Sequence, residues 1–265
     1  MKKIDLKIAL LLATICFAGG LLLVPYQLDT LRLMNGPVDY AKIIGEIPLP
    51  ISVLTLISAV QLSIISFILA FLGLKVARKT GFSFSILESI LKKGKKVVFH
   101  GKSIWLSVLF GAITGFILAG ADKFYFQNLI PKLANSEPEI SLLGLFAGVL
   151  YGGVFEEILM RLLFMSLLVW GLQKVFNRNK EKNDGWIYWF SNFIAAIAFA
   201  AGHLPATKMF FGELTGILIL RCFLINGIGG IFWGFLYWKK GLEYAIISHM
   251  FAHITMQLLF IPLFY

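Results

Sequence analysis

Seven long apolar runs constrain the fold of this chain more than any other feature of its sequence. Each is about 20 or more mostly apolar residues long, the length an α-helix needs to cross the hydrocarbon core of a bilayer. A backbone that crosses lipid must satisfy its own hydrogen bonds, so the runs predict an all-α, polytopic transmembrane bundle. A short or re-entrant segment within 203–216 would raise seven spans to eight. The runs cover about 6–24, 49–74, 103–121, 141–170, 186–204, 213–238 and 242–263.

The composition agrees with a membrane protein. Hydrophobic residues make up 58% of the chain and charged residues 14%, against roughly 45–50% and about 25% in soluble domains. The two cysteines, Cys16 and Cys222, lie inside apolar runs, where we expect small buried hydrophobes and no disulfide framework. The first run follows basic residues, as a signal peptide does, but no clear cleavage site follows it. We expect this run to remain as the first span.

The basic residues predict the orientation of the spans. Seventeen of the 24 lysines and arginines lie before or at the start of the first run or in connections 75–102, 171–185 and 239–241, whereas the alternate connections hold five. The positive-inside rule then places the N-terminus in the cytoplasm, and we expect a bacterial plasma membrane. The net charge of +10 thus reflects topology. We expect no nucleic-acid partner, because no basic patch interleaved with aromatic residues stands on a polar domain.

The connection 75–102 has two interpretations. It is basic but also contains apolar residues, among them Phe82, Phe84, Ile86 and Leu87. It is therefore either an amphipathic helix on the anionic inner surface of the membrane or a solvated loop that sets topology.

The fourth run carries three ionisable residues near its middle, Glu156, Glu157 and Arg161. Each costs roughly 2.5 to 3.5 kcal/mol at the centre of a membrane helix, so such groups pair, line a cavity or take part in chemistry. Glu157 and Arg161 are four residues apart and predict an intrahelical ion pair. Glu156 points about 100° away, toward a cavity in which it could act as a general base. The alternative is a triad that only packs helices together.

Three of the four histidines lie in the last three runs. His203 ends one run, and His249 and His253 share a helical face in another. Two mechanisms remain open. In the first, Glu156 and His203 activate a water while His249 and His253 stabilise an oxyanion. In the second, His249 and His253, with His203 or a glutamate, hold a zinc ion.

Three details do not follow from this scheme. Counted from the basic flanks, His203 lies about 20 Å or more from the cytoplasmic side and His249 about 12 Å, so a common site needs tilted helices or a deeper start. Arg221 is alone in its run. It pairs with Glu213 or a carbonyl, extends to the interface, or binds a substrate carboxylate. Asn226 is a further candidate for the lining of the site.

Three motifs in chain order resemble those of the CPBP family of CAAX proteases and bacteriocin-processing or abortive-infection proteins. They are Glu156-Glu157-x-x-x-Arg161, Phe199-x-x-x-His203 and His249-x-x-x-His253. The last departs from the family, which more often has Asn or Asp at the position of His253. A histidine can still donate a hydrogen bond, and it is also a better metal ligand than Asn.

The resemblance implies an intramembrane endopeptidase similar to the type II CAAX prenyl endopeptidases. Its substrate would be a membrane-tethered peptide or protein, prenylated in that group, and no cofactor is needed unless zinc is used. Glu156 would activate water with His203, His249 and His253 would form the oxyanion hole, and Glu157 and Arg161 would support the site. The catalytic core would be residues 141–265, after three N-terminal helices in 1–140. The alternatives are a proton- or ion-coupled transporter and a non-catalytic immunity or scaffold protein.

Overall fold

The computed structural model describes residues 3–92, 94–135, 138–176 and 185–265, except for the side chains of 34–39. It confirms the all-α bundle: seven helical stretches are long and apolar enough to cross a membrane, and the described residues contain no strand. Large apolar side chains remain exposed along the spans, for example Leu10 (52%), Leu56 (53%) and Trp105 (75%). Such a surface suits contact with lipid tails.

The first three spans are α1 (Lys3–Gly45), α2 (Ile51–Ala77) and α4 (Gly101–Phe124). The short helix α3 (Ser85–Leu91) lies between α2 and α4. The turn η1 (Phe126–Asn128) and α5 (Pro131–Ala134) follow α4.

The fourth span is one rod made of α6 (Leu142–Ala147), two π-helical segments, η2 (Gly148–Glu156) and η3 (Ile158–Met165), and α7 (Ser166–Phe176). The fifth comprises α8 (Gly185–Gly202) and α9 (Leu204–Phe211), so the short segment expected within 203–216 exists without adding a span. The sixth is α10 (Gly216–Lys239), and the last is α11 (Leu242–Thr255), η4 (Met256–Phe260) and α12 (Ile261–Phe264).

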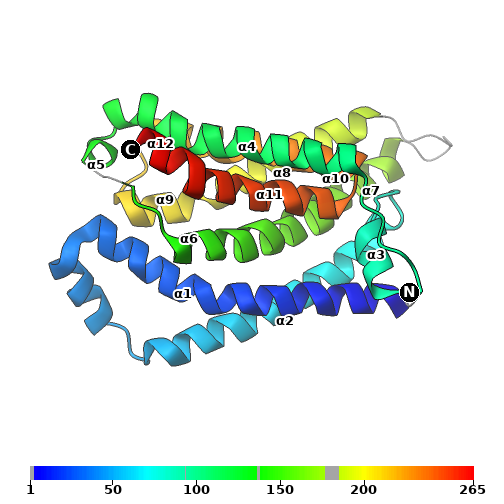
Figure 1. Ribbon diagram of the computed structural model, residues 1–265, viewed down its shortest axis with the longest axis horizontal. Helices are drawn as coiled ribbons and strands as arrows, with labels where there is room; N and C mark the ends of the chain where they lie inside the picture. Colours follow the sequence, from blue (N-terminus) through cyan, green and yellow to red (C-terminus); the bar gives the residue numbers. More distant parts are fainter. Residues whose placement is uncertain (1–2, 93, 136–137, 177–184) are drawn as a thin grey trace.

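The helices run along the long axis of the molecule (Figure 1). The N-terminus and α3 lie at one end, and the C-terminus and α5 lie at the other (Figure 1). The hairpin of α1 and α2 packs against the rod of the fourth span, α4 packs along α11, and α8 along α10. One large apolar core joins these layers and takes side chains from α1, α2, the rod, α8, α10 and α11.

The connection between α2 and α4 fits neither interpretation along its whole length. Phe82, Phe84, Ile86 and Leu87 are 2–8% exposed and belong to the main core, so this part is packed on protein and does not lie on the membrane surface. The backbone N–H of Leu87 donates to the buried carboxylate of Glu243, 2.9 Å away. Residues 94–100 form a continuous exposed stretch, as expected of a solvated loop.

This packing also explains the uneven depths of the histidines. The first residues of α11, from Leu242 to Ala245, are 0–6% exposed, because the segment that includes α3 covers them. The N–H of Leu242 donates to the carbonyl of Ser83 at 3.3 Å. Helix α11 therefore begins inside the protein, and the depth of His249 counted from the basic flank was an underestimate.

An ion network holds the same end of the bundle together. The Arg78 guanidinium lies 2.6 Å from the buried Asp5 carboxylate of α1 and 2.5 Å from Glu88 of α3. Lys92 approaches Glu88 at 2.6 Å. Burial raises the pKa of Glu88, but the hydrogen bonds from Lys92 and Arg78 outweigh it and keep that pKa below its ordinary value.

The contact between α1 and α2 depends on a glycine. A Cβ atom on Gly20 would lie 2.6 Å from the Cα atom of Ala59, too close for the two backbones to keep their spacing. We expect Gly20→Ala to lower the free energy of unfolding by about 1–3 kcal/mol. Thermal unfolding in detergent, followed by tryptophan fluorescence, measures this.

The matched control is Gly171→Ala in α7, where a Cβ would meet nothing within 4 Å. It should leave the melting temperature unchanged or raise it, because alanine favours a helix over glycine. Equal melting temperatures for Gly20→Ala and the wild type would contradict the close contact.

Candidate active site

The two glutamates lie where the fourth span has π-helical geometry. Glu156 ends η2, Glu157 follows it, and Arg161 lies within η3. π-helical turns are rare and occur often at functional sites, because they alter which side chains share a face. Here they direct Glu157 and Arg161 into the sealed interior, both 0% exposed, while the Glu156 side chain keeps 17% exposure.

The expected ion pair between Arg161 and Glu157 is present, with 3.2 Å between Arg161 Nη1 and Glu157 Oε1. Arg161 Nη2 also donates to the carbonyl of Gly230 in α10 at 2.8 Å. The guanidinium lies over the rings of Phe199 and Trp233, 5.0 and 5.3 Å from their centroids. A buried cation is thus compensated by one carboxylate, one carbonyl and two aromatic faces.

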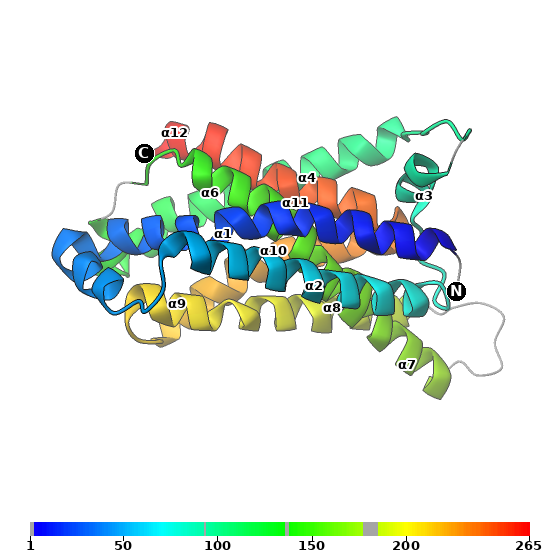
Figure 2. The ribbon, with the colours of Figure 1, turned by 90° about the horizontal axis from the view of Figure 1, so that it is seen from below.

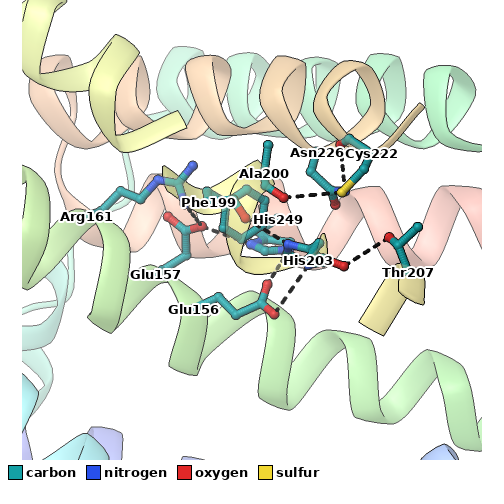
Figure 3. Close-up of polar contacts among 10 residues, drawn as sticks. All are labelled: Glu156, Glu157, Arg161, Phe199, Ala200, His203, Thr207, Cys222, Asn226 and His249. Carbon is teal, nitrogen blue, oxygen red and sulfur yellow. Dashed lines mark hydrogen bonds and ion pairs between the residues drawn. The ribbon is translucent and has the colours of Figure 1, made fainter. Parts of the chain in front are cut away.

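His249 lies between the two glutamates (Figure 3). Its Nδ1 is 2.9 Å from Glu157 Oε1, and its Nε2 is 3.7 Å from Glu156 Oε2. The indole of Trp233 stacks on the imidazole, with centroids 3.5 Å apart and planes at 12°. Glu157 therefore has two partners, Arg161 and His249, of which the sequence predicted only the first.

His203 lies at the break between α8 and α9. Its Nδ1 is 2.9 Å from the carbonyl oxygen of Phe199, four residues earlier. Since a carbonyl only accepts, Nδ1 carries the proton and Nε2 is left as an acceptor. Nε2 faces Glu156 Oε1 at 3.9 Å (Figure 3). The side chain is 33% exposed, so this side of the site is open.

His253 lies one turn beyond His249, and the two rings are nearly parallel, with centroids 5.3 Å apart. It packs against the glycine face of η2, where a Cβ on Gly152 would lie 2.8 Å from its Nε2. The structure gives this imidazole no hydrogen-bond partner among the residues it describes. Its donors and acceptors are free for a ligand.

Two other candidates have hydrogen-bond partners outside this cluster. Arg221 forms a bidentate ion pair with Asp122 of α4, at 2.6 and 2.5 Å, a partner that was not among the alternatives considered from the sequence. The amide of Asn226 donates to the carbonyl of Cys222 within α10. Both cysteines are free and buried, as expected.

The six residues singled out in the motifs thus gather from the fourth, fifth and seventh spans. Trp233 of α10 was missed, because a tryptophan in an apolar run carries no signal that separates a ring stacked on a histidine from one that fills a core. Within the described part of the chain, no three His, Cys, Asp or Glu side chains converge closely enough to hold a metal ion in this conformation.

Comparison with known proteins identifies the stretch that contains this cluster. Residues 138–255 match the family model described as type II CAAX prenyl endopeptidase Rce1-like. No curated protein and no solved structure matches the chain. The matched residues run from just before α6 to the end of α11 and include all six motif residues. Through this stretch the chain, an integral membrane protein, is similar to the Rce1-like type II CAAX prenyl endopeptidases, consistent with the CPBP family that its motifs resemble.

Proposed function

We propose that this protein hydrolyses a peptide bond in a membrane-associated substrate, using a water activated by Glu156 and His203. The observation that carries the proposal is the Glu156 carboxylate, whose two oxygens face two different imidazoles at 3.9 and 3.7 Å. These gaps are too long for direct hydrogen bonds, and gaps of this size are where a bridging water is expected. The match of residues 138–255 to an endopeptidase family model supports the reaction class.

In the proposed reaction, Glu156 is the general base. Its carboxylate takes one proton from the water, the oxygen attacks the scissile carbonyl carbon, and the carbonyl electrons move onto oxygen. His203 Nε2 accepts a hydrogen bond from the second water hydrogen, which stays on the attacking oxygen. Nε2 is the acceptor because the Nδ1–H donates to the Phe199 carbonyl. When the tetrahedral intermediate collapses, the C–N bond breaks and Glu156 returns its proton to the leaving amine.

His249 and His253 are the proposed donors to the oxyanion. The Nδ1–H of His249 donates to Glu157, so an Nε2–H for the oxyanion requires that the ring carry both protons. The neighbouring carboxylates stabilise that second proton, whereas burial and the Arg161 guanidinium oppose it. Glu157 and Arg161 then act as positioning residues that hold this ring.

Replacing the base tests the proposal directly. We expect Glu156→Gln to lower the cleavage rate at least about 100-fold, since it keeps the shape of the side chain but cannot take a proton. His203→Ala should lower it as well. The measurement is cleavage of a membrane-tethered peptide, such as one with a farnesylated cysteine followed by three residues, by purified protein in lipid nanodiscs.

The matched control is Glu139→Gln, the same change at an exposed glutamate before α6, which should cleave like the wild type. A Glu156→Gln variant as active as the wild type would refute the role of Glu156. A wild type that cleaves nothing across a broad set of lipidated and unlipidated membrane peptides would refute the reaction.

We propose that the reaction needs no metal, with zinc bound through His249, His253 and His203 or a glutamate as the competing mechanism. The separate hydrogen-bonding and stacking partners of the imidazoles support the metal-free form. We expect purified protein to contain far less than one zinc per chain and to keep its activity after chelation. Elemental analysis and cleavage assays measure both. Stoichiometric zinc, with activity lost on chelation and restored by zinc, would establish the other mechanism.

We further propose that the protein lies in a bacterial plasma membrane with its N-terminus in the cytoplasm. The end of the bundle that holds the N-terminus and α3 also holds Lys3, Lys7, Lys92 and Lys95, which line one groove there. A cysteine introduced at Lys95 should react with an impermeant maleimide only after the cells are opened. Labelling of this position in intact cells would show that the N-terminal end faces outward and would refute the proposed orientation.

A further inference from the structure

A groove of about 310 Å³ lies between α1, α2 and α9. Its lining is mostly aliphatic, but it includes the amides of Gln27 and Gln61 and the hydroxyl of Ser58. Both glutamines are exposed. Neither amide bonds to any group that the structure describes. Figure 2 shows α9 beside the hairpin of α1 and α2.

The position of these amides makes them unusual. Gln27 belongs to the span Lys3–Leu33 and Gln61 to the span Ile51–Ala77. In a lipid environment an unpaired carboxamide is costly, because no water replaces the missing partner. A carboxamide offers two N–H donors and one acceptor, the same groups that an extended peptide backbone needs to satisfy. An acyl chain could fill the groove but could not bond to either glutamine.

Two of the helices that line the groove are linked to elements of the proposed active site. Met209 contributes to its lining from α9, the helix that begins directly after His203. In α1, Tyr26 precedes the lining residue Gln27 and packs on Gly144, at the start of the rod that carries Glu156. A chain lying in the groove would therefore contact α9, which begins directly after His203.

We propose that this groove binds an extended segment of the membrane-embedded peptide substrate, with the carboxamides of Gln27 and Gln61 hydrogen-bonded to its peptide groups. This inference rests on the proposed function, because the occupant is the substrate of that site. It assigns recognition of the backbone to α1 and α2, which precede the stretch that matches the family model. The aliphatic walls accept apolar side chains of varied shape.

Binding of a fluorescent farnesylated peptide to the full-length protein in nanodiscs tests this inference. Fluorescence anisotropy compares the wild type with the double variant Gln27→Leu/Gln61→Leu. Leucine keeps the approximate size of glutamine but removes its hydrogen bonds. We expect Kd to rise about 5- to 10-fold, and in the cleavage assay KM should rise while kcat stays the same. The matched control, Gln127→Leu in η1 outside the groove, should bind like the wild type.

A peptide N-methylated at the backbone amides after the cysteine sharpens the test. The wild type should bind the methylated peptide more weakly than the unmodified one. The double variant should bind both peptides equally, because the hydrogen bonds need both the glutamine amides and the peptide N–H groups. The inference is overturned if the double variant binds as the wild type does, or if the wild type binds no peptide. It is also overturned if the substitutions change only the oligomeric state, which would assign the glutamines to a second copy.

These outcomes separate the two proposals. Peptide binding that depends on the glutamines, in a protein that cleaves nothing, would refute the protease and keep the groove. Cleavage with an unchanged KM in the double variant would support the protease and refute the role of the groove.

Discussion

The buried guanidinium of Arg161 is the group on which the arrangement of the site depends. It pairs with Glu157 in its own span, donates to Gly230 of α10, and lies over Phe199 of α8 and Trp233 of α10. Through Glu157 it also reaches His249 of α11. One cation thus determines how four helices are rotated toward one another, because an uncompensated charge at this depth costs several kcal/mol.

The compensation is incomplete within the described residues. Arg161 Nε and Nη1 and Glu157 Oε2 are buried without a hydrogen bond there, as is Trp233 Nε1. An apolar set of side chains of similar volume would be at least as stable, since buried ion pairs often cost more in desolvation than they return. The cluster is thus better explained by orientation than by stability: it holds the His249 ring in one plane, with Nδ1 at Glu157 and Nε2 toward Glu156.

The sequence predicted the spans, the Arg161–Glu157 pair and the residues that converge on Glu156, because hydropathy, spacing and motif order all act along one chain. The sequence did not predict the side-chain contacts between helices. The bond between Glu157 and His249, the stacking of Trp233 and the pairing of Arg221 with Asp122 depend on how each helix is rotated about its axis. A uniformly apolar run does not specify that rotation. The burial of Phe84 and Ile86 was missed for the same reason: a pattern of apolar residues does not distinguish lipid from protein as the partner.

The bond between Glu243 and the backbone of α3 has a mechanical consequence. Glu243 lies in the first turn of α11, six residues before His249, and a helix transmits a displacement along its axis almost rigidly. Helix α11 cannot slide without breaking this bond and the one from Leu242 to Ser83. The alignment of His249 and His253 with Glu156 is therefore fixed by an anchor in the first turn of α11, outside the cluster of reacting groups.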